Sequence, residues 1–199
     1  MRVVIKPAGL FILIAIAAIL FSLILFGILR PRPAAVAQKQ LAKQPVTSAT
    51  DIYTGQTWEL LVLVNGIGGM TENMGAVPGA TEPVKIYTLT LNTAPKEPWQ
   101  FALHLPTPAP VVKGEKLRLT FRARSKDAVP VVVNFEQNSL PYAKSVTQDE
   151  STTGEWKQYS VEFNAVDDYA PEASQVAIHC GLKVGTLEIA DLHLYRIAQ

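Results

Sequence analysis

The sequence predicts an all-β domain, an antiparallel jelly-roll β-sandwich, preceded by a single transmembrane α-helix. Three observations lead to this fold class. An uncharged apolar run of 22 residues lies near the N-terminus, segments with alternating apolar and polar side chains follow Asp51, and Pro and Gly separate these segments. Eight short strands without a convincing helix between them are typical of a sandwich or jelly roll.

The composition fits a folded domain rather than a disordered or collagen-like chain, because 48% of the 199 residues are apolar and only 18% are charged. Residues 51–199 amount to about 150 residues, the usual size of one domain. All 17 acidic residues lie at or after Asp51, together with 12 of the 18 basic residues, so this region carries a net charge of −5. Since binding to nucleic acid requires a basic face, we expect no nucleic-acid partner.

The N-terminal region predicts a membrane anchor. A short tail, residues 1–7, precedes the apolar run, residues 8–29. A helix of that length spans about 33 Å, enough for the roughly 30 Å hydrocarbon core of a lipid bilayer. A cleaved signal peptide is the alternative, because Arg2 and Lys6 precede the run and residues 35–37 fit a cleavage site. The run exceeds the apolar part of a signal peptide, so we expect an uncleaved signal anchor in the cell membrane.

The orientation of this anchor rests on a near tie in charge. Arg2 and Lys6 stand on one side of the run, and Arg30 and Arg32 on the other. Short N-terminal tails before a large domain usually stay inside, so we expect a cytoplasmic N-terminus and a periplasmic or extracellular C-terminal domain. Residues 30–50, rich in Pro, Ala, Gln and Lys, predict an extended tether between the two.

The domain, residues 51–199, is divided by its alternating pattern into eight predicted strands. These are Trp58–Val64, Val84–Leu91, Trp99–Leu105, Lys116–Ser125, Val129–Gln137, Trp156–Asn164, Gln175–Gly181 and Thr186–Ile197.

The fourth of these strands shows the alternation best. Leu117, Leu119, Phe121 and Ala123 alternate with polar residues, so we expect their face to pack on the core. The opposite face carries Arg118, Arg122 and Arg124. We expect this arginine row to be solvated or paired internally, opposite Glu136 or Glu162, rather than to bind an anion.

Several motifs between Trp58 and Tyr195 resemble a known family. They are Pro98-Trp99 before a strand, Lys113-Gly114-Glu115 before "LRLTFRARS", Pro141-Tyr142, "WKQYSVEF" and "GTLEIAD". Together they are similar to the carbohydrate-binding modules of families 4, 9 and 22, which are galactose-binding-like jelly rolls. The Asn-Gly-x-Phe-Glu signature common in these modules is absent, and "DIYTGQTWELL" stands in its place.

The resemblance implies that Trp99, Gln137 and Tyr142 line a concave face that binds sugar. Aromatic rings stack on the C–H faces of a pyranose, and amides pair with its hydroxyls. The residues themselves favour a structural role for all three. Trp99 and Tyr142 each follow a proline and would cap the core, and Gln137 would satisfy a strand edge.

No catalytic or metal-binding motif is present. His104, His179 and His193 lack the spacing of a zinc site. His179 and Cys180 are neighbours in a predicted strand, so they point to opposite faces and cannot act together. We therefore expect no enzyme activity, no metal and no cofactor.

Residues 65–83 show no strand pattern and contain five glycines and two prolines. A loop of this length in a compact domain commonly serves a function, so it is a candidate contact surface for a partner protein. Met70 and Met74 would supply adaptable apolar contacts there. The alternative is a loop without a partner.

Two classes of function follow. In the favoured hypothesis, the chain is a non-catalytic accessory subunit of a larger membrane complex, such as a respiratory or photosynthetic electron-transport assembly. Small residues at spacings of three and four, Ala15, Ala18 and Ser22, would dock its helix among other helices. In the alternative hypothesis, the chain is a membrane-tethered carbohydrate-binding module that recognises a cell-wall or surface polysaccharide.

Overall fold

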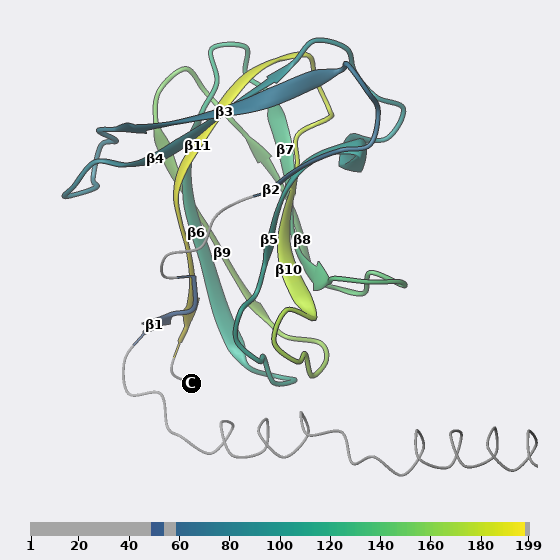
Figure 1. Cartoon of the computed structure of the whole chain (residues 1–199). Helices are drawn as coiled ribbons and strands as arrows, with labels where there is room; N and C mark the ends of the chain where they lie inside the picture. The colour runs from purple at the N-terminus through teal and green to yellow at the C-terminus, as the bar shows by residue number, and fades with distance from the viewer. Residues whose placement is uncertain (1–48, 54–58, 198–199) are drawn as a thin grey trace, which may run out of the picture. The chain divides into compact units, whose positions relative to one another are not determined.

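The computed structural model describes residues 49–53 and 59–197, which form two antiparallel β-sheets packed face to face (Figure 1). The predicted transmembrane helix, its docking residues Ala15, Ala18 and Ser22, and the tether up to residue 48 lie outside the described residues. Within the described ranges, no helix combines the length and apolar character needed to cross a bilayer.

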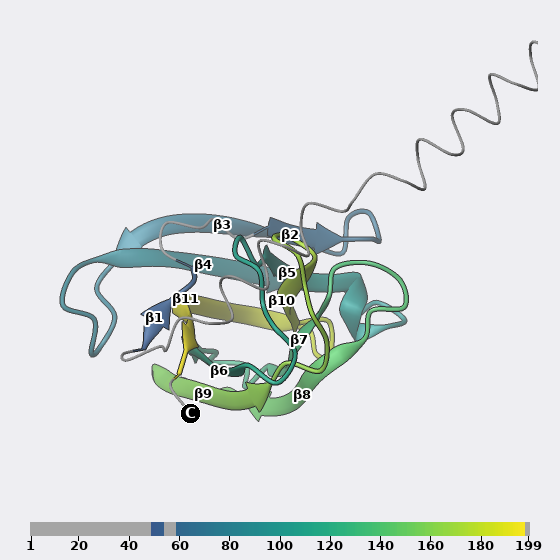
Figure 2. The same ribbon diagram turned by 90° about the horizontal axis from the view of Figure 1, so that it is seen from below.

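One sheet has six strands in the order β3-β4-β11-β6-β9, with β1 paired to β11 in addition. The other has five strands in the order β2-β5-β10-β7-β8. Figure 2 shows β2 and β3 at one side of the sandwich and β8 and β9 at the other. The strands are β1 (Thr50–Asp51), β2 (Glu59–Val62), β3 (Gly68–Gly75), β4 (Val84–Leu91), β5 (Phe101–Pro106), β6 (Lys116–Arg124), β7 (Pro130–Gln137), β8 (Lys144–Ser151), β9 (Lys157–Asn164), β10 (Ser174–His179) and β11 (Gly185–Arg196), and a 3₁₀ turn, η1 (Pro98–Gln100), precedes β5.

The all-β sandwich predicted from the sequence is confirmed, and each of the eight predicted strands corresponds to an observed one. The prediction that residues 65–83 contain no strand is wrong, because β3 pairs with β4 along its whole length. The prediction also missed β1 and β8. Both β3 and β8 are edge strands with mostly exposed, polar side chains, so neither needs the alternation that marks a half-buried strand.

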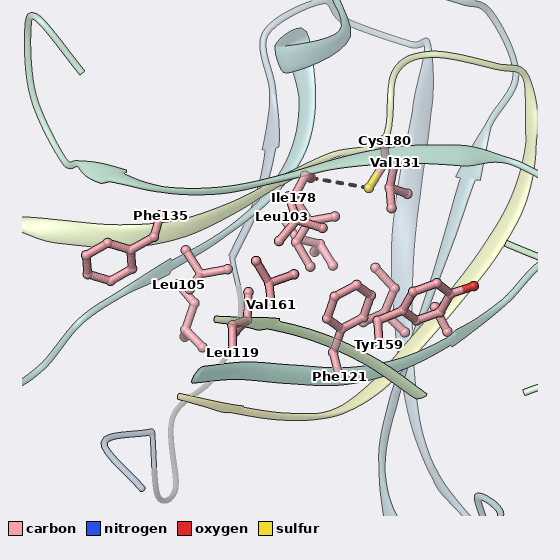
Figure 3. Packing of buried hydrophobic residues seen from close by; sticks show 14 of the residues in the cluster. Leu103, Leu105, Leu119, Phe121, Val131, Phe135, Tyr159, Val161, Ile178 and Cys180 are labelled. Carbon is pink, nitrogen blue, oxygen red and sulfur yellow. Dashed lines mark hydrogen bonds between the residues drawn. The ribbon is translucent and has the colours of Figure 1, made fainter. Parts of the chain in front are cut away.

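The core lies between the two sheets. Leu103, Val131, Phe135 and Ile178 reach it from the five-stranded sheet, and all are at most 1% exposed. From the other sheet, β6 presents the apolar face that its alternation predicted. Figure 3 shows Phe121 of this face against Tyr159, and the two rings stack with centroids 5.0 Å apart.

Tyr53 joins the start of the domain to both sheets. It follows β1, which pairs with the six-stranded sheet. Its hydroxyl group bonds to the carbonyl oxygen of Leu105 in the five-stranded sheet at 3.0 Å and to Oγ1 of Thr107 at 3.0 Å. Burial raises the pKa of this phenol, so it remains a neutral donor. Tyr53 therefore anchors the end of the first described segment in the core.

The outer face of the six-stranded sheet is partly covered by its own chain. Val77, from the β3–β4 connection, is 3% exposed and packs against Ile86 and Ala190 on that face. Gly79 has a φ of 87° and lies over the guanidinium group of Arg122, where a Cβ atom would come within 2.6 Å of it. This segment therefore covers Ile86 of β4 and Ala190 of β11.

The arginine row on this face is paired internally, as predicted. Arg118 bonds to Glu162 at 2.9 Å, and Arg122 bonds to Asp191 at 3.0 Å. Arg124 pairs with Glu188 and lies over the ring of Trp156, 4.8 Å from its centroid. Of the two partners considered from the sequence, Glu162 is correct, because Glu136 belongs to the other sheet.

Candidate functional site

The outer face of the five-stranded sheet carries a group of polar side chains from its three central strands. Along β5, β7 and β10, apolar residues face the core at every second position, so the residues between them face outward. The outward polar residues are His104, Asn134, Glu136, Gln175 and His179. We call these five residues the polar face.

Two alanines form the floor of the polar face. Ala177 of β10 pairs with His104 on one side and with Asn134 on the other. Ala102 of β5 pairs with His179. Because alanine ends at Cβ, the longer side chains around these two positions stand above them. They cover both alanines completely, so hydrogen-bonding side chains form the surface above them.

A carboxylate organises one half of the polar face. Oε1 of Glu136 accepts a hydrogen bond from Nε2 of Gln175 at 3.1 Å, and Oε2 accepts one from Nζ of Lys144 in β8. Gln175 in turn bonds to the His104 ring. Although they face outward, Glu136 and Gln175 are only 4% and 2% exposed, so neighbouring side chains hold them in fixed positions.

Asn134 organises the other half. Its Oδ1 accepts a hydrogen bond of 2.9 Å from the hydroxyl group of Thr147 in β8. Its Nδ2 lies 3.4 Å from the carbonyl oxygen of Ala177 and 3.4 Å from Nε2 of His179. Asn134 is completely buried, which fixes the plane of its amide. Both halves therefore present planar polar groups that are already oriented.

Both imidazoles of the polar face are neutral at pH 7. Burial lowers the pKa of His104, and it lowers the pKa of His179 to about 4. A neutral ring offers one donor and one acceptor, whereas an imidazolium offers donors only. With Glu136 neutralised by Lys144, the five residues and Lys144 together carry no net charge.

The lowered pKa of His179 predicts how the free energy of unfolding depends on pH. His179 has a pKa near 6.5 when unfolded and about 4 when folded, so the unfolded chain binds more protons between these values. The free energy of unfolding should therefore fall as the pH is lowered from about 6.5 to 4. We expect His179→Gln to flatten this decline in urea unfolding of the full chain in mild detergent.

His193→Gln is the control for this prediction. Burial alone would lower the pKa of His193, but hydrogen bonds to Asp51 and Asp191 raise it overall. Its contribution to stability is complete below the unfolded pKa and is lost as the pH rises through the folded value. The control should change the pH dependence above about 6.5 and leave the decline between about pH 6.5 and 4 unchanged. An unaltered acid decline in His179→Gln would contradict the assignment.

The structure does not bring the three predicted sugar-binding residues together. Gln137 ends β7 and Tyr142 lies in the β7–β8 connection, which Figure 1 shows projecting from the sheet at the lower right. Trp99 lies in η1, at the opposite end of the sheet. The two ends of β10 show this, because Ser174 at its start pairs with Gln137, and His179 at its end pairs with Ala102, close to η1. Gln137 bonds to Oγ of Ser139 at 3.2 Å.

Trp99 and Tyr142 are 45% and 46% exposed, so neither is buried in the core. Both rings stand at the ends of the five-stranded sheet, one at each end of β10. The polar face itself was missed in the sequence. Its signal is the alternation of polar and apolar residues in Pro130–Gln137 and Ser174–His179. That pattern located the strands but did not show which polar residues share a face.

The predicted partner-contact residues differ in exposure. Met70 in β3 is partly buried and packs against the core. Met74 is 64% exposed on the same edge strand. Both residues lie in β3 rather than in a loop, and Met74 is the more exposed of the two.

The described residues show no metal-binding group of three or more His, Cys, Asp or Glu side chains. Cys180 points into the core, opposite to His179, as the alternation predicted. Its thiol lies 3.3 Å from the carbonyl oxygen of Ile178, a contact drawn in Figure 3, and burial raises its pKa to about 12. A buried, protonated thiol is not a nucleophile.

No family model and no curated protein sequence matches the chain. Solved structures do match. A structure described as "CBM4 structure and function" is 18% identical, with a TM-score of 0.55, over 78% of this chain and 96% of its own. The second N-terminal cellulose-binding domain of Cellulomonas fimi β-1,4-glucanase C is 19% identical, with a TM-score of 0.53, over 78% of this chain and 100% of its own.

A Stig cyclase from Fischerella sp. TAU is also similar, with 12% identity and a TM-score of 0.53 over 76% of this chain and 99% of its own. At these identities the similarity establishes the fold alone, a jelly-roll β-sandwich of the kind found in carbohydrate-binding modules. Because the fold is shared by binding modules and a cyclase, the function must be argued from the residues of the site.

Proposed function

We propose that the chain is a non-catalytic carbohydrate-binding module and that it binds a polysaccharide on the polar face. The observation that carries this proposal is the network of pre-oriented amide, imidazole and carboxylate groups above Ala102 and Ala177. Sugar hydroxyls act as donor and acceptor at once, so they match groups of both kinds. The longer side chains cover both alanines completely, so a sugar would contact His104 and His179, the partly exposed members of the polar face.

The exposed aromatic residues support the same function. Trp99 and Tyr142 stand at opposite ends of the sheet and are nearly half exposed, so their rings are accessible to the sugar units of an extended chain. Aromatic rings that bind ligand remain exposed without it. The jelly-roll fold shared with a cellulose-binding domain is consistent with this role.

The hypothesis of an accessory subunit has less support. Its helix-docking residues lie outside the described residues, Met70 is partly buried, and the structural comparison favours a binding module. Membrane attachment through residues 8–29, with the domain outside the cytoplasm, remains part of our proposal. It is supported by the length and apolar character of that run.

Affinity electrophoresis of the full chain in mild detergent tests the proposal. The gels would contain hydroxyethyl cellulose, xylan or mixed-linkage glucan, with a polysaccharide-free gel as reference. We expect at least one polysaccharide to retard the wild-type chain. His179→Ala should weaken retention about tenfold or more, because a lost hydrogen bond in a binding site leaves its partner unpaired. Asn134→Ala should weaken it too, because the buried amide of Asn134 holds the His179 ring in position. Tyr142→Ala and Trp99→Ala should weaken it by removing a stacking surface.

Arg118→Ala is the matched control, because this residue lies on the outer face of the other sheet and pairs with an exposed Glu162. It should bind as the wild type does. Far-UV circular dichroism would verify that each variant is folded. Equal retention of wild type, Asn134→Ala and His179→Ala would exclude the polar face as the binding site. If no polysaccharide retards the wild type, the proposal is wrong and the accessory-subunit hypothesis is favoured instead.

A further inference from the structure

A second cluster of charged side chains lies on the outer face of the six-stranded sheet, where β1 meets β11. Nδ1 of His193 lies 2.7 Å from Oδ2 of Asp51, and Nε2 lies 3.0 Å from Oδ1 of Asp191. Asp191 also accepts a hydrogen bond of 3.0 Å from Nε of Arg122. The imidazole ring therefore bridges a carboxylate of β1 and a carboxylate of β11.

The geometry requires a proton on each ring nitrogen. A carboxylate oxygen accepts hydrogen bonds, and both nitrogens of His193 face one. A neutral imidazole has a single N–H, so it would direct a lone pair at one of the two carboxylates. When His193 is charged, the positive charges of His193 and Arg122 balance the negative charges of Asp51 and Asp191. The side chain of His193 is 34% exposed, so solvent protons reach it.

Asp51 stands at the junction between the N-terminal part of the chain and the domain. Its second oxygen, Oδ1, accepts a hydrogen bond of 3.0 Å from the backbone N–H of Tyr53. The strand that it belongs to is only two residues long and pairs with Tyr195 and Arg196 of β11. One further backbone bond joins the N–H of Ile52 to the carbonyl oxygen of Leu194 at 2.7 Å. With so short a ladder, the side-chain contacts form a large part of the attachment.

We propose that Asp51, His193, Asp191 and Arg122 form a proton-dependent clasp that fastens β1, and with it the point where residues 1–48 join the domain, to β11. When His193 loses its proton, the ring can donate to only one carboxylate and loses its charge attraction to both. The attachment of β1 then depends on its backbone ladder and on Tyr53.

The surroundings of His193 favour the closed clasp at neutral pH. On β11, Tyr195 stacks on the ring with centroids 5.5 Å apart, and Asp191 faces it. On β1 the facing group is Asp51. On β6 the neighbouring charges are Arg118, which pairs with Glu162, and Arg122. Burial alone would lower the pKa of His193, but the two carboxylates raise it overall, so opening occurs on the alkaline side.

Hydrogen exchange measured by mass spectrometry on the full chain in mild detergent tests the clasp. After correction for the intrinsic exchange rate, we expect protection of residues 50–53 to fall about tenfold between about pH 6 and pH 9, the change expected for loss of one charge-assisted hydrogen bond. In His193→Gln, protection should be low at both pH values. In Asp51→Asn, the transition should move to lower pH, because the ring loses one of its two anions while the Tyr53 amide keeps an acceptor.

His104→Gln is the control, because it removes an imidazole from the other sheet. It should exchange as the wild type does in residues 50–53. Protection that does not change with pH in the wild type would overturn the proposal. So would a His193→Gln variant with the pH profile of the wild type. Unchanged protection of β6 across all variants would show that the effect is local to β1 rather than a general loss of stability.

Discussion

Replacement of Phe121 by alanine is expected to lower the free energy of unfolding by about 3–5 kcal/mol. Phe121 is completely buried between the sheets, and its ring stacks on Tyr159. Removal of the ring loses its transfer free energy and leaves a cavity, because β-strands fixed by their ladders cannot move in to fill it. Urea unfolding of the full chain in mild detergent, followed by near-UV circular dichroism, would measure the change.

Met74→Ala provides the matched control, since it also removes a large apolar side chain but from an exposed edge position. It should change stability by no more than about 0.5 kcal/mol. Trp99→Ala should also cost much less than Phe121→Ala, because Trp99 is 45% exposed. A loss as large as that of Phe121→Ala would support the structural role that the sequence favoured for Trp99, as a cap of the core.

Replacement of Glu136 by alanine is expected to lower the free energy of unfolding by about 1–3 kcal/mol. Its carboxylate is nearly buried and accepts hydrogen bonds from both Gln175 and Lys144. Without it, Gln175 stays buried with a lost acceptor and Lys144 loses its partner. The same variant should weaken polysaccharide binding, because Gln175 and His104 lose their fixed orientation. The two effects would be measured by urea unfolding and by affinity electrophoresis.

Glu162→Ala tests whether the expected loss of stability in Glu136→Ala is due to the burial of the Glu136 carboxylate. Glu162 also has two partners, Lys116 and Arg118, but its side chain is 42% exposed. Water screens such pairs, so their loss should leave the urea midpoint almost unchanged. An equal effect of the two substitutions would mean that the network around Glu136 adds nothing beyond an ordinary surface ion pair. Loss of stability in Glu136→Ala with unchanged retention would separate the stability of the polar face from its binding.

The sequence alone determined the class of the fold and the two sides of most strands. Alternation has a period of two, the same as that of side chains along a strand, so Lys116–Arg124 and Lys157–Asn164 could be divided into core and solvent faces without coordinates. The same rule placed His179 and Cys180 on opposite faces. It could not find β3 or β8, because their side chains are mostly exposed and do not alternate, whereas β9, which also lies at an edge, keeps one buried face.

The tertiary structure decided which polar residues meet. His104, Asn134 and Gln175 come from three strands far apart in the sequence, and only the register of β5, β10 and β7 brings them around Ala177. Local pattern gives the face of each residue but not its level along a neighbouring strand, because register depends on pairing between distant segments. Asp51 and His193 are 142 residues apart for the same reason. Trp99 and Tyr142, alike in sequence context, are separated by the length of a strand.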